Sequence, residues 1–304
     1  MAWPNFLVIG SGRSGTTSLH HYLRQHPEVF LPKLKSPSYF YCIDAPQASS
    51  SQRARETRAY FVRDAASYQA LFDDSGAATA VGEVSPVYLA SRRVAPRVAE
   101  HLPDARLVAI LRNPIERLHS RFVARRRDGL EKIPDLGTLV ERERRMPLVR
   151  EDAAGTYLSA GFVSHVLDGY FKVFLKEQIL LLVFDDLVRD PAGTLRELFE
   201  FLRVDPNVVV DPRAHNSSGG EIANPLVRLL WTRSALPRQW LRGFLPRGLR
   251  DAAFSLATGR LQPAPISVAQ YRELARLYAG EITALECRLE RDLSHWMEPP
   301  ATSG

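Results

Sequence analysis

A glycine-rich stretch near the start of the chain carries the residue types of an anion-binding loop. It reads GSGRSGTTS over residues 10–18, between the apolar run FLVI and the helical pattern LHHYLRQHP. Such a turn between a buried strand and a helix offers backbone N–H groups and a helix N-terminus to a phosphate. Loops for nucleoside triphosphates follow GxxxxGK[ST]. The glycine spacing and the hydroxyl of Thr17 are kept here, but Thr16 takes the lysine position, and Arg13 is the only cation in the loop.

A second set of polar side chains follows another apolar run. The segment ARLVAILRNPIERLHSRF, residues 105–122, is typical of a buried strand that ends at Arg112, followed by Asn-Pro and a helix that carries Ser120. In open α/β folds ligands bind at the carboxyl edge of the sheet, where Arg112 is expected. Either residue alone is commonly an ordinary surface residue. Together with the glycine-rich loop, they indicate two anion sites for one ligand.

Apolar runs and helical patterns alternate along the chain, which is the arrangement of a parallel sheet covered by helices. Three runs are apolar enough to be buried on both faces, and they predict strands at 6–9, 105–111 and 178–184. Helices are expected at 15–26, 91–101, 114–128, 161–175, 191–202 and 268–294. We therefore predict an α/β fold, with a P-loop-type central parallel β-sheet flanked by helices on both faces.

The rest of the chain shows no internal repeat and no boundary with the composition of a linker. We therefore expect one domain over residues 1–304. The polar stretch 45–58 and the stretch 129–155 are expected to be irregular.

Composition limits the class of protein and of ligand. The 304 residues carry 40 Lys and Arg against 34 Asp and Glu, a net charge of +6 that favours anionic ligands without indicating nucleic acid. The only cysteines, Cys42 and Cys287, make neither a disulfide framework nor a metal cluster. No signal peptide or membrane-spanning run is recognised. We expect a soluble, cytoplasmic protein that uses no metal.

The pairing of FLVIGSGRSGTTSL with VAILRNPIERLHS resembles the PAPS-dependent sulfotransferases, in particular bacterial members related to the heparan-sulfate enzymes. PAPS is 3′-phosphoadenosine-5′-phosphosulfate. The segments GEVSPVYL at 82–89, the run 161–191 and HNSSGG at 215–220 resemble family segments in family order. The resemblance implies that Arg112 and Ser120 bind the 3′-phosphate. It implies that the 5′ end is held by Arg13, Ser14, Gly15, Thr16, Thr17 and Ser18.

The resemblance also implies a reaction. A sulfuryl group would pass from PAPS to a hydroxyl or amine of a carbohydrate, lipid or small natural-product acceptor by in-line transfer without metal. A sulfuryl group bears a single charge, so the magnesium-oriented part of the nucleotide loop is free to change. A cation beside the bridging oxygen is still needed, because charge develops there, and we predict Arg13 for this role. Lys35, and less strongly Lys33, is expected to stabilise the transferring sulfonate.

The general base is the point where the sequence departs from the family. Relatives commonly carry a glutamate after the lysine of a KEPxFF-like segment, whereas Ser36 follows Lys35 here. A serine cannot remove a proton alone. Glu83, after the strand-like AVGE, is our candidate for the base, and Asp44 and His20 are weaker candidates. The missing glutamate also keeps open a non-catalytic member that binds a nucleotide or a sulfated glycan.

Two further interpretations remain at this stage. The glycine spacing and the acidic pair Asp185 and Asp186 also fit a P-loop nucleotide kinase or NTPase, although Thr16 in the lysine position opposes it. Residues 222–250 contain arginines and aromatic residues but no acidic residue. They are expected to pack on the sheet with their arginines outward. Alternatively, the C-terminal part 222–304 covers the acceptor, or residues 222–250 touch an anionic membrane surface. The oligomeric state is left open.

Overall fold

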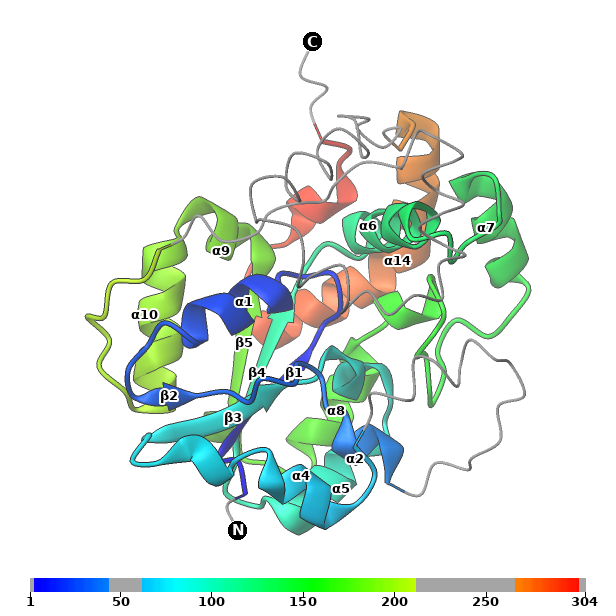
Figure 1. Cartoon of the computed structure of the whole chain (residues 1–304). Helices are drawn as coiled ribbons and strands as arrows, with labels where there is room; N and C mark the ends of the chain where they lie inside the picture. Colours follow the sequence, from blue (N-terminus) through cyan, green and yellow to red (C-terminus); the bar gives the residue numbers. More distant parts are fainter. Residues whose placement is uncertain (1–2, 44–61, 212–265, 301–304) are drawn as a thin grey trace, which may run out of the picture.

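The structure is a computed structural model that describes residues 3–43, 62–211 and 266–300 (Figure 1). Its centre is one parallel sheet with the strand order β2-β3-β1-β4-β5. The strands are β1 (Phe6–Gly10), β2 (Val29–Phe30), β3 (Ala80–Val84), β4 (Arg106–Leu111) and β5 (Ile179–Val183). The chain builds β2 and β3 on one side of β1, and β4 and β5 on the other. The gap between β1 and β4 is therefore a switch point, where α/β sheets bind ligands.

Helices cover both faces of this sheet, as predicted. They are α1 (Thr16–Leu23), α2 (Tyr39–Cys42), α4 (Ala65–Ala70), α5 (Val94–His101), α6 (Pro114–Arg127), α7 (Leu136–Arg144), α8 (Ser164–Phe171), α9 (Phe184–Arg189), α10 (Pro191–Leu202) and α14 (Val268–Leu289). Successive strand residues point to opposite faces. Val8 of β1 accordingly packs in a core with α1, α9 and α10. Its neighbour Leu7 packs in a second core with α5, α6, α8 and α14 (Figure 1).

The predicted elements agree with the structure where the apolar pattern is strong. The three predicted strands are present to within two residues at each end. The helix predicted at 191–202 is α10, and the one predicted at 114–128 is α6. The helix α6 begins at Pro114, and the side chain of Asn113 caps it by accepting the N–H of Ile115. Asn-Pro is thus a helix start in the structure as in the sequence.

Four expectations about the less regular parts need correction or lie outside the described residues. The stretch 129–155 is not wholly irregular, because it contains α7, which begins where Asp135 accepts the N–H of Thr138. The last predicted helix is shorter than 268–294, because α14 ends at Leu289. The stretches 45–58 and 222–250 lie outside the described residues. No helix in the described ranges is long and apolar enough to cross a membrane.

Glu281 joins α14 to the start of α8. One of its oxygens accepts the N–H groups of Val163 and Ser164, both at 2.8 Å, and the other accepts the Ser164 hydroxyl at 2.6 Å. The side chain is buried, and burial raises its pKa. The last helix is therefore held to the sheet domain through a buried polar contact.

Removal of this contact is expected to destabilise the protein. Glu281→Ala leaves two backbone donors and a hydroxyl without an acceptor, and we expect it to lower the free energy of unfolding by about 2–4 kcal/mol. Urea denaturation at pH 7 measures the loss. The control is Glu290→Ala, which breaks an exposed pair with Lys176 and should lower it by less than about 1 kcal/mol. Equal losses in the two variants would contradict the role of Glu281.

Candidate functional site

The glycine-rich loop connects β1 to α1 and leaves the start of that helix open. Gly15 is the residue before α1, and its φ of 91° lies in the left-handed region that favours glycine. A Cβ there would lie 2.9 Å from the ring of Phe184, so a side chain would also meet α9. No side chain of the described residues caps α1, and its first N–H groups are therefore available to an anion.

Arg13 connects this loop to the second motif. Its Nε and Nη2 donate to the Ser120 hydroxyl of α6 at 3.1 and 2.9 Å. Arg112, just after β4, donates from Nη1 to the carbonyl of Arg13 at 3.2 Å. The Arg112 guanidinium also lies 4.5 Å from the centre of the Phe184 ring and pairs with Glu116. The structure thus brings Arg13, Arg112 and Ser120 together, while their role in holding a nucleotide stays a prediction.

The charges around this contact are mostly positive. Burial lowers the pKa of Arg13, and the charges of Arg127 and Arg112 lower it further. A lowered pKa for a cation means that its charged form is disfavoured by its surroundings. A bound anion would remove that penalty, so the arrangement is suited to an anionic ligand.

Lys35 supplies a second cation on the other side of the loop. It follows β2 in the chain, and its Nζ donates to the Thr17 hydroxyl at 2.6 Å. Burial, and then the charge of Arg13, lowers its pKa. An ammonium therefore reaches the loop from a different segment, although Thr16 occupies the usual lysine position. The Ser14 hydroxyl is 2.6 Å from that of Ser11, and Thr16 and Ser18 are buried on α1.

The position of Glu83 corrects its assignment as the base. Its side chain is 0% exposed. One carboxylate oxygen accepts the hydroxyls of Tyr68 at 3.0 Å and Tyr88 at 2.6 Å, and the other accepts that of Ser85. Burial raises its pKa to about 7 although these hydrogen bonds oppose the shift. A carboxylate without exposed surface cannot touch an acceptor. The expectation that Glu83 reaches the cleft is therefore wrong.

Glu83 instead organises the segment that carries Lys35. The Ser85 hydroxyl that donates to Glu83 accepts the N–H of Ser38 at 3.0 Å. The Tyr88 hydroxyl that donates to Glu83 accepts the N–H of Phe40 at 3.3 Å. Two relays therefore run from the buried carboxylate to the backbone that follows Lys35. We interpret Glu83 as a positioning residue.

Ser36, in the usual glutamate position, and His20, a weaker candidate for the base, are also constrained. Ser36 donates its hydroxyl to the carbonyl of Val84 at 3.1 Å, so it is used in holding the chain to β3. His20 on α1 is 6% exposed, and neither ring nitrogen has a hydrogen-bond partner among the described residues. Burial, followed by the charge of Lys35, lowers the pKa of His20 to about 4, so the ring is neutral at pH 7. Asp44 lies outside the described residues.

The acidic pair Asp185 and Asp186 is engaged in contacts with the C-terminal segment. Asp185 accepts the indole N–H of Trp296 at 2.8 Å, and Asp186 pairs with Arg189 and Arg291. Among the described residues, no group of three His, Cys, Asp or Glu side chains could hold a metal ion. The acidic pair is thus a structural contact, and the kinase interpretation that it supported is not favoured.

A cavity of about 230 Å³ opens beside the loop. Its described lining comes from the loop, from the turn after β3, from α6 and from the 154–163 segment: Ser11, Gly12, Pro86, Val87, Leu89, Ala90, Arg117, Arg121, Ala154, Gly155, Ala160 and Val163. Our sequence analysis missed Arg117 and Arg121. Their spacing of four residues, which places them on one face of a helix, was the available signal.

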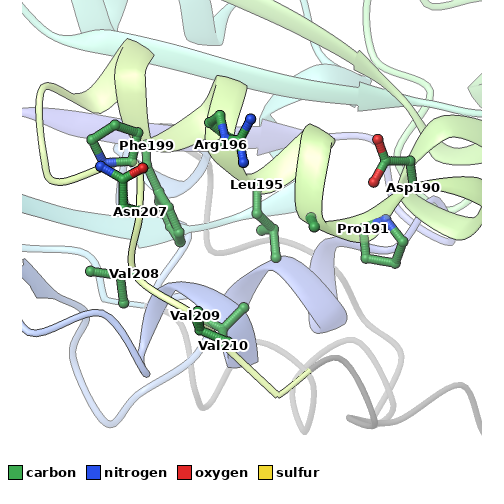
Figure 2. A pocket seen from close by; sticks show the side chains of 11 residues that line it. Asp190, Pro191, Leu195, Arg196, Phe199, Asn207, Val208, Val209 and Val210 are labelled. Atoms are coloured by element: carbon green, nitrogen blue, oxygen red, sulfur yellow. The ribbon is translucent and has the colours of Figure 1, made fainter.

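A second cavity, of about 290 Å³, lies between α10 and residues 206–210 (Figure 2). Leu195 and Phe199 of the helix face Val208, Val209 and Val210 across it. None of the predicted site residues lines this cavity. None of them lines the cavity beside the loop either, which the loop reaches through Ser11 and Gly12.

Comparisons with known proteins identify the family and the fold of the chain. A family model described as the Sulfotransferase family matches residues 4–207, which include β1, the loop, Lys35, Arg112 and Ser120. The chain belongs to the sulfotransferase family. Its fold matches a crystal structure of a sulfotransferase from Alicyclobacillus acidocaldarius, with a TM-score of 0.74 and 25% identity over 97% of this chain and 99% of that one.

Two of the relatives are named as heparan sulfate sulfotransferases. Human heparan sulfate glucosamine 3-O-sulfotransferase 6 is 27% identical over 200 residues, which are 66% of this chain and 52% of the relative. Human bifunctional heparan sulfate N-deacetylase/N-sulfotransferase 2 is 26% identical over 207 residues, 67% of this chain and 22% of the relative. The membrane-associated sulfotransferase kil1 of Dictyostelium discoideum is 32% identical over 119 residues, 39% of this chain and 22% of the relative. The sulfotransferase described here spans about half or less of the length of these relatives.

Proposed function

We propose that this sulfotransferase moves a sulfuryl group from PAPS to a hydroxyl or amine of an acceptor. The observation that carries the proposal is the contact of Arg13 with Ser120 and Arg112 at the switch point of the sheet. This contact joins the segment that the resemblance assigns to the 5′-phosphosulfate with the residues it assigns to the 3′-phosphate. One PAPS molecule would therefore occupy both.

The proposed donor site uses groups that are in place. The open N-terminus of α1 would bind the 5′-phosphate through backbone N–H groups. Ser120, whose hydroxyl now accepts from Arg13, would donate to the 3′-phosphate beside Arg112. Lys35 and Arg13 flank the loop and would stabilise the sulfonate and the bridging oxygen.

The transfer itself would be an in-line displacement. The acceptor oxygen or nitrogen bonds to sulfur while the bond from sulfur to the 5′-phosphate oxygen breaks. The acceptor proton is released, and 3′,5′-adenosine bisphosphate leaves with the negative charge. Positioned cations supply the stabilisation, so the donor site needs no magnesium bridge.

The acceptor side is proposed more broadly. The relatives whose names refer to heparan sulfate support a carbohydrate hydroxyl or amine as the first acceptor class to test. We propose that residues 1–304 act as one cytoplasmic catalytic domain, in which α14 is held to the sheet by Glu281.

Calorimetry tests the donor assignment. We expect 3′,5′-adenosine bisphosphate to bind without magnesium, and Arg112→Ala to weaken this binding by about 10- to 100-fold because a charged hydrogen bond to phosphate is lost. The control is Arg276→Ala, an exposed arginine on α14, which should leave the affinity unchanged. Turnover of PAPS against a panel of acceptors tests catalysis. Binding of ATP with magnesium, and none of the bisphosphate, would overturn the proposal in favour of a kinase or NTPase.

A further inference from the structure

The cavity beside the loop has a wall of positive charge. Ser11 and Gly12 line it from the phosphosulfate loop, while Arg117 and Arg121 line it from α6. The two arginines are one helical turn apart and face the same space. An anion in this cavity would lie next to the loop without occupying Arg112 or Ser120.

Arg121 is a partly buried cation without a hydrogen-bonding or ionic partner in the described parts of the chain. Its Nε is buried and makes no hydrogen bond to the described residues, and its guanidinium carbon lies 5.6 Å from the centre of the Tyr157 ring. Burial, followed by the charges of Arg117 and Arg125, lowers its pKa to about 10. A buried guanidinium normally has a carboxylate, a phosphate or carbonyl groups around its donors. Its partner is therefore expected to come from a ligand.

Arg117 adds a second, partly used guanidinium. It is 3% exposed, and its Nη2 donates to the carbonyl of Tyr157 at 3.2 Å, while its buried Nε has no partner in the part of the chain that the structure describes. Burial lowers its pKa. The cavity thus holds two cations with donors left over.

The nearby carboxylates are used elsewhere. Glu143, which acts on the charge of Arg121, accepts the N–H groups of Tyr157 and Leu158 at 2.9 and 2.8 Å. Glu281, which acts on the charge of Arg117, accepts from the start of α8. Neither carboxylate forms an ion pair with Arg117 or Arg121 among the described residues.

We propose that this cavity binds an anionic group of the acceptor, a carboxylate or a sulfate ester, through Arg121 with Arg117 beside it. The inference rests on the proposed function and adds the substrate class: an acidic acceptor whose reacting hydroxyl or amine faces the loop. A guanidinium presents paired donors that match the two oxygens of such a group. The cavity is smaller than the roughly 300–1,000 Å³ of pockets that enclose whole ligands, so it suits one charged group or one ring of a larger acceptor.

Paired probes test the charge preference. Isothermal titration of the full chain saturated with 3′,5′-adenosine bisphosphate compares 4-nitrophenyl β-D-glucuronide with 4-nitrophenyl β-D-glucoside, which differ by one carboxylate. The 6-sulfate of the same glucoside distinguishes a sulfate ester from a carboxylate. We expect at least one charged probe to bind 10-fold or more tightly than the neutral one. Equal affinities, or no binding by any probe, would overturn the inference.

Variants of Arg121 assign the preference to this cavity. Arg121→Gln should reduce the ratio of affinities to about 1, and Arg121→Lys should leave an intermediate ratio because a point charge replaces a planar fork. Both should bind the bisphosphate within about twofold of the parent chain, because the donor site is separate. Loss of bisphosphate binding by the parent chain would mean that the proposed function fails, whereas a retained ratio in Arg121→Gln would overturn the inference alone.

A stability measurement separates a ligand site from a structural role. Arg121→Met replaces a partly buried charge, which has no ionic partner among the described residues, with an apolar chain of similar length. We expect the ligand-free variant to melt about 2–4 °C above the parent chain while losing the charge preference. A lower melting temperature would indicate that Arg121 supports the fold and would count against the proposal.

Discussion

Arg13→Ala is expected to lower kcat for sulfuryl transfer by roughly 100- to 1,000-fold, with a much smaller change in the affinity for 3′,5′-adenosine bisphosphate. Negative charge develops on the bridging oxygen as the bond to sulfur breaks, and removal of one preorganised donor from such an oxygen has an effect of this size. Steady-state turnover of labelled PAPS, together with calorimetry of the product nucleotide, measures the two quantities separately.

The split between kcat and affinity decides between two roles of Arg13. In the structure its guanidinium donates to Ser120, on the side proposed for the 3′-phosphate. If that contact persisted in the complex, the variant would lose nucleotide affinity by the same factor as kcat, and the role at the bridging oxygen would be wrong. Arg13→Lys is the matched control. It keeps the charge but not the fork of donors, so we expect it to recover most of kcat.

The sequence predicted the frame of the site because strong patterns position it. β1 and β4 are uninterrupted apolar runs, and each is followed by a loop with a recognisable polar residue. Because these two strands are neighbours in the sheet, the residues after them had to come close together. The meeting of Arg13 with Arg112 therefore follows from the strand order, although the hydrogen bond to Ser120 depends on side-chain directions that no sequence pattern specifies.

The parts that the sequence did not predict depend on contacts between distant segments. Ser36 and Ser38 adopt positive φ values of 60° and 57°, which no glycine signals, and the turn between them is held by β3 and by Ser85. A stretch such as AVGE shows a carboxylate near a strand end but not the tyrosines that enclose it. The arginines of α6 likewise look like a solvated face until residues 154–163 are seen to cover them.

The stability of the protein should depend on pH through Glu83. Its pKa is raised to about 7 by burial, against 4.5 for an ordinary glutamate, so the folded state favours the protonated form. A raised pKa contributes stability that is complete below pH 4.5 and is lost as the pH rises through 7. Across this interval the free energy of unfolding should fall by up to about 3 kcal/mol on account of this group.

His20 should act in the opposite direction. Its pKa is lowered to about 4, so it contributes stability above pH 6.5 that is lost as the pH falls towards 4. Between pH 4.5 and 6.5 the two contributions largely cancel in the parent chain. A variant that lacks one of the two groups should therefore show the pH dependence of stability that comes from the other.

Glu83→Gln tests the contribution of Glu83 to the pH dependence of stability. Urea denaturation at intervals from pH 4.5 to 8 should find that the stability of the variant, relative to the parent chain, increases by about 3 kcal/mol across the range. The stability of His20→Gln, relative to the parent chain, should increase as the pH falls. An unchanged difference between Glu83→Gln and the parent chain at all pH values would mean that the carboxylate is ionised throughout. In that case the three hydroxyls around it would outweigh its burial, and the relays to Ser38 and Phe40 would be anchored on a charge.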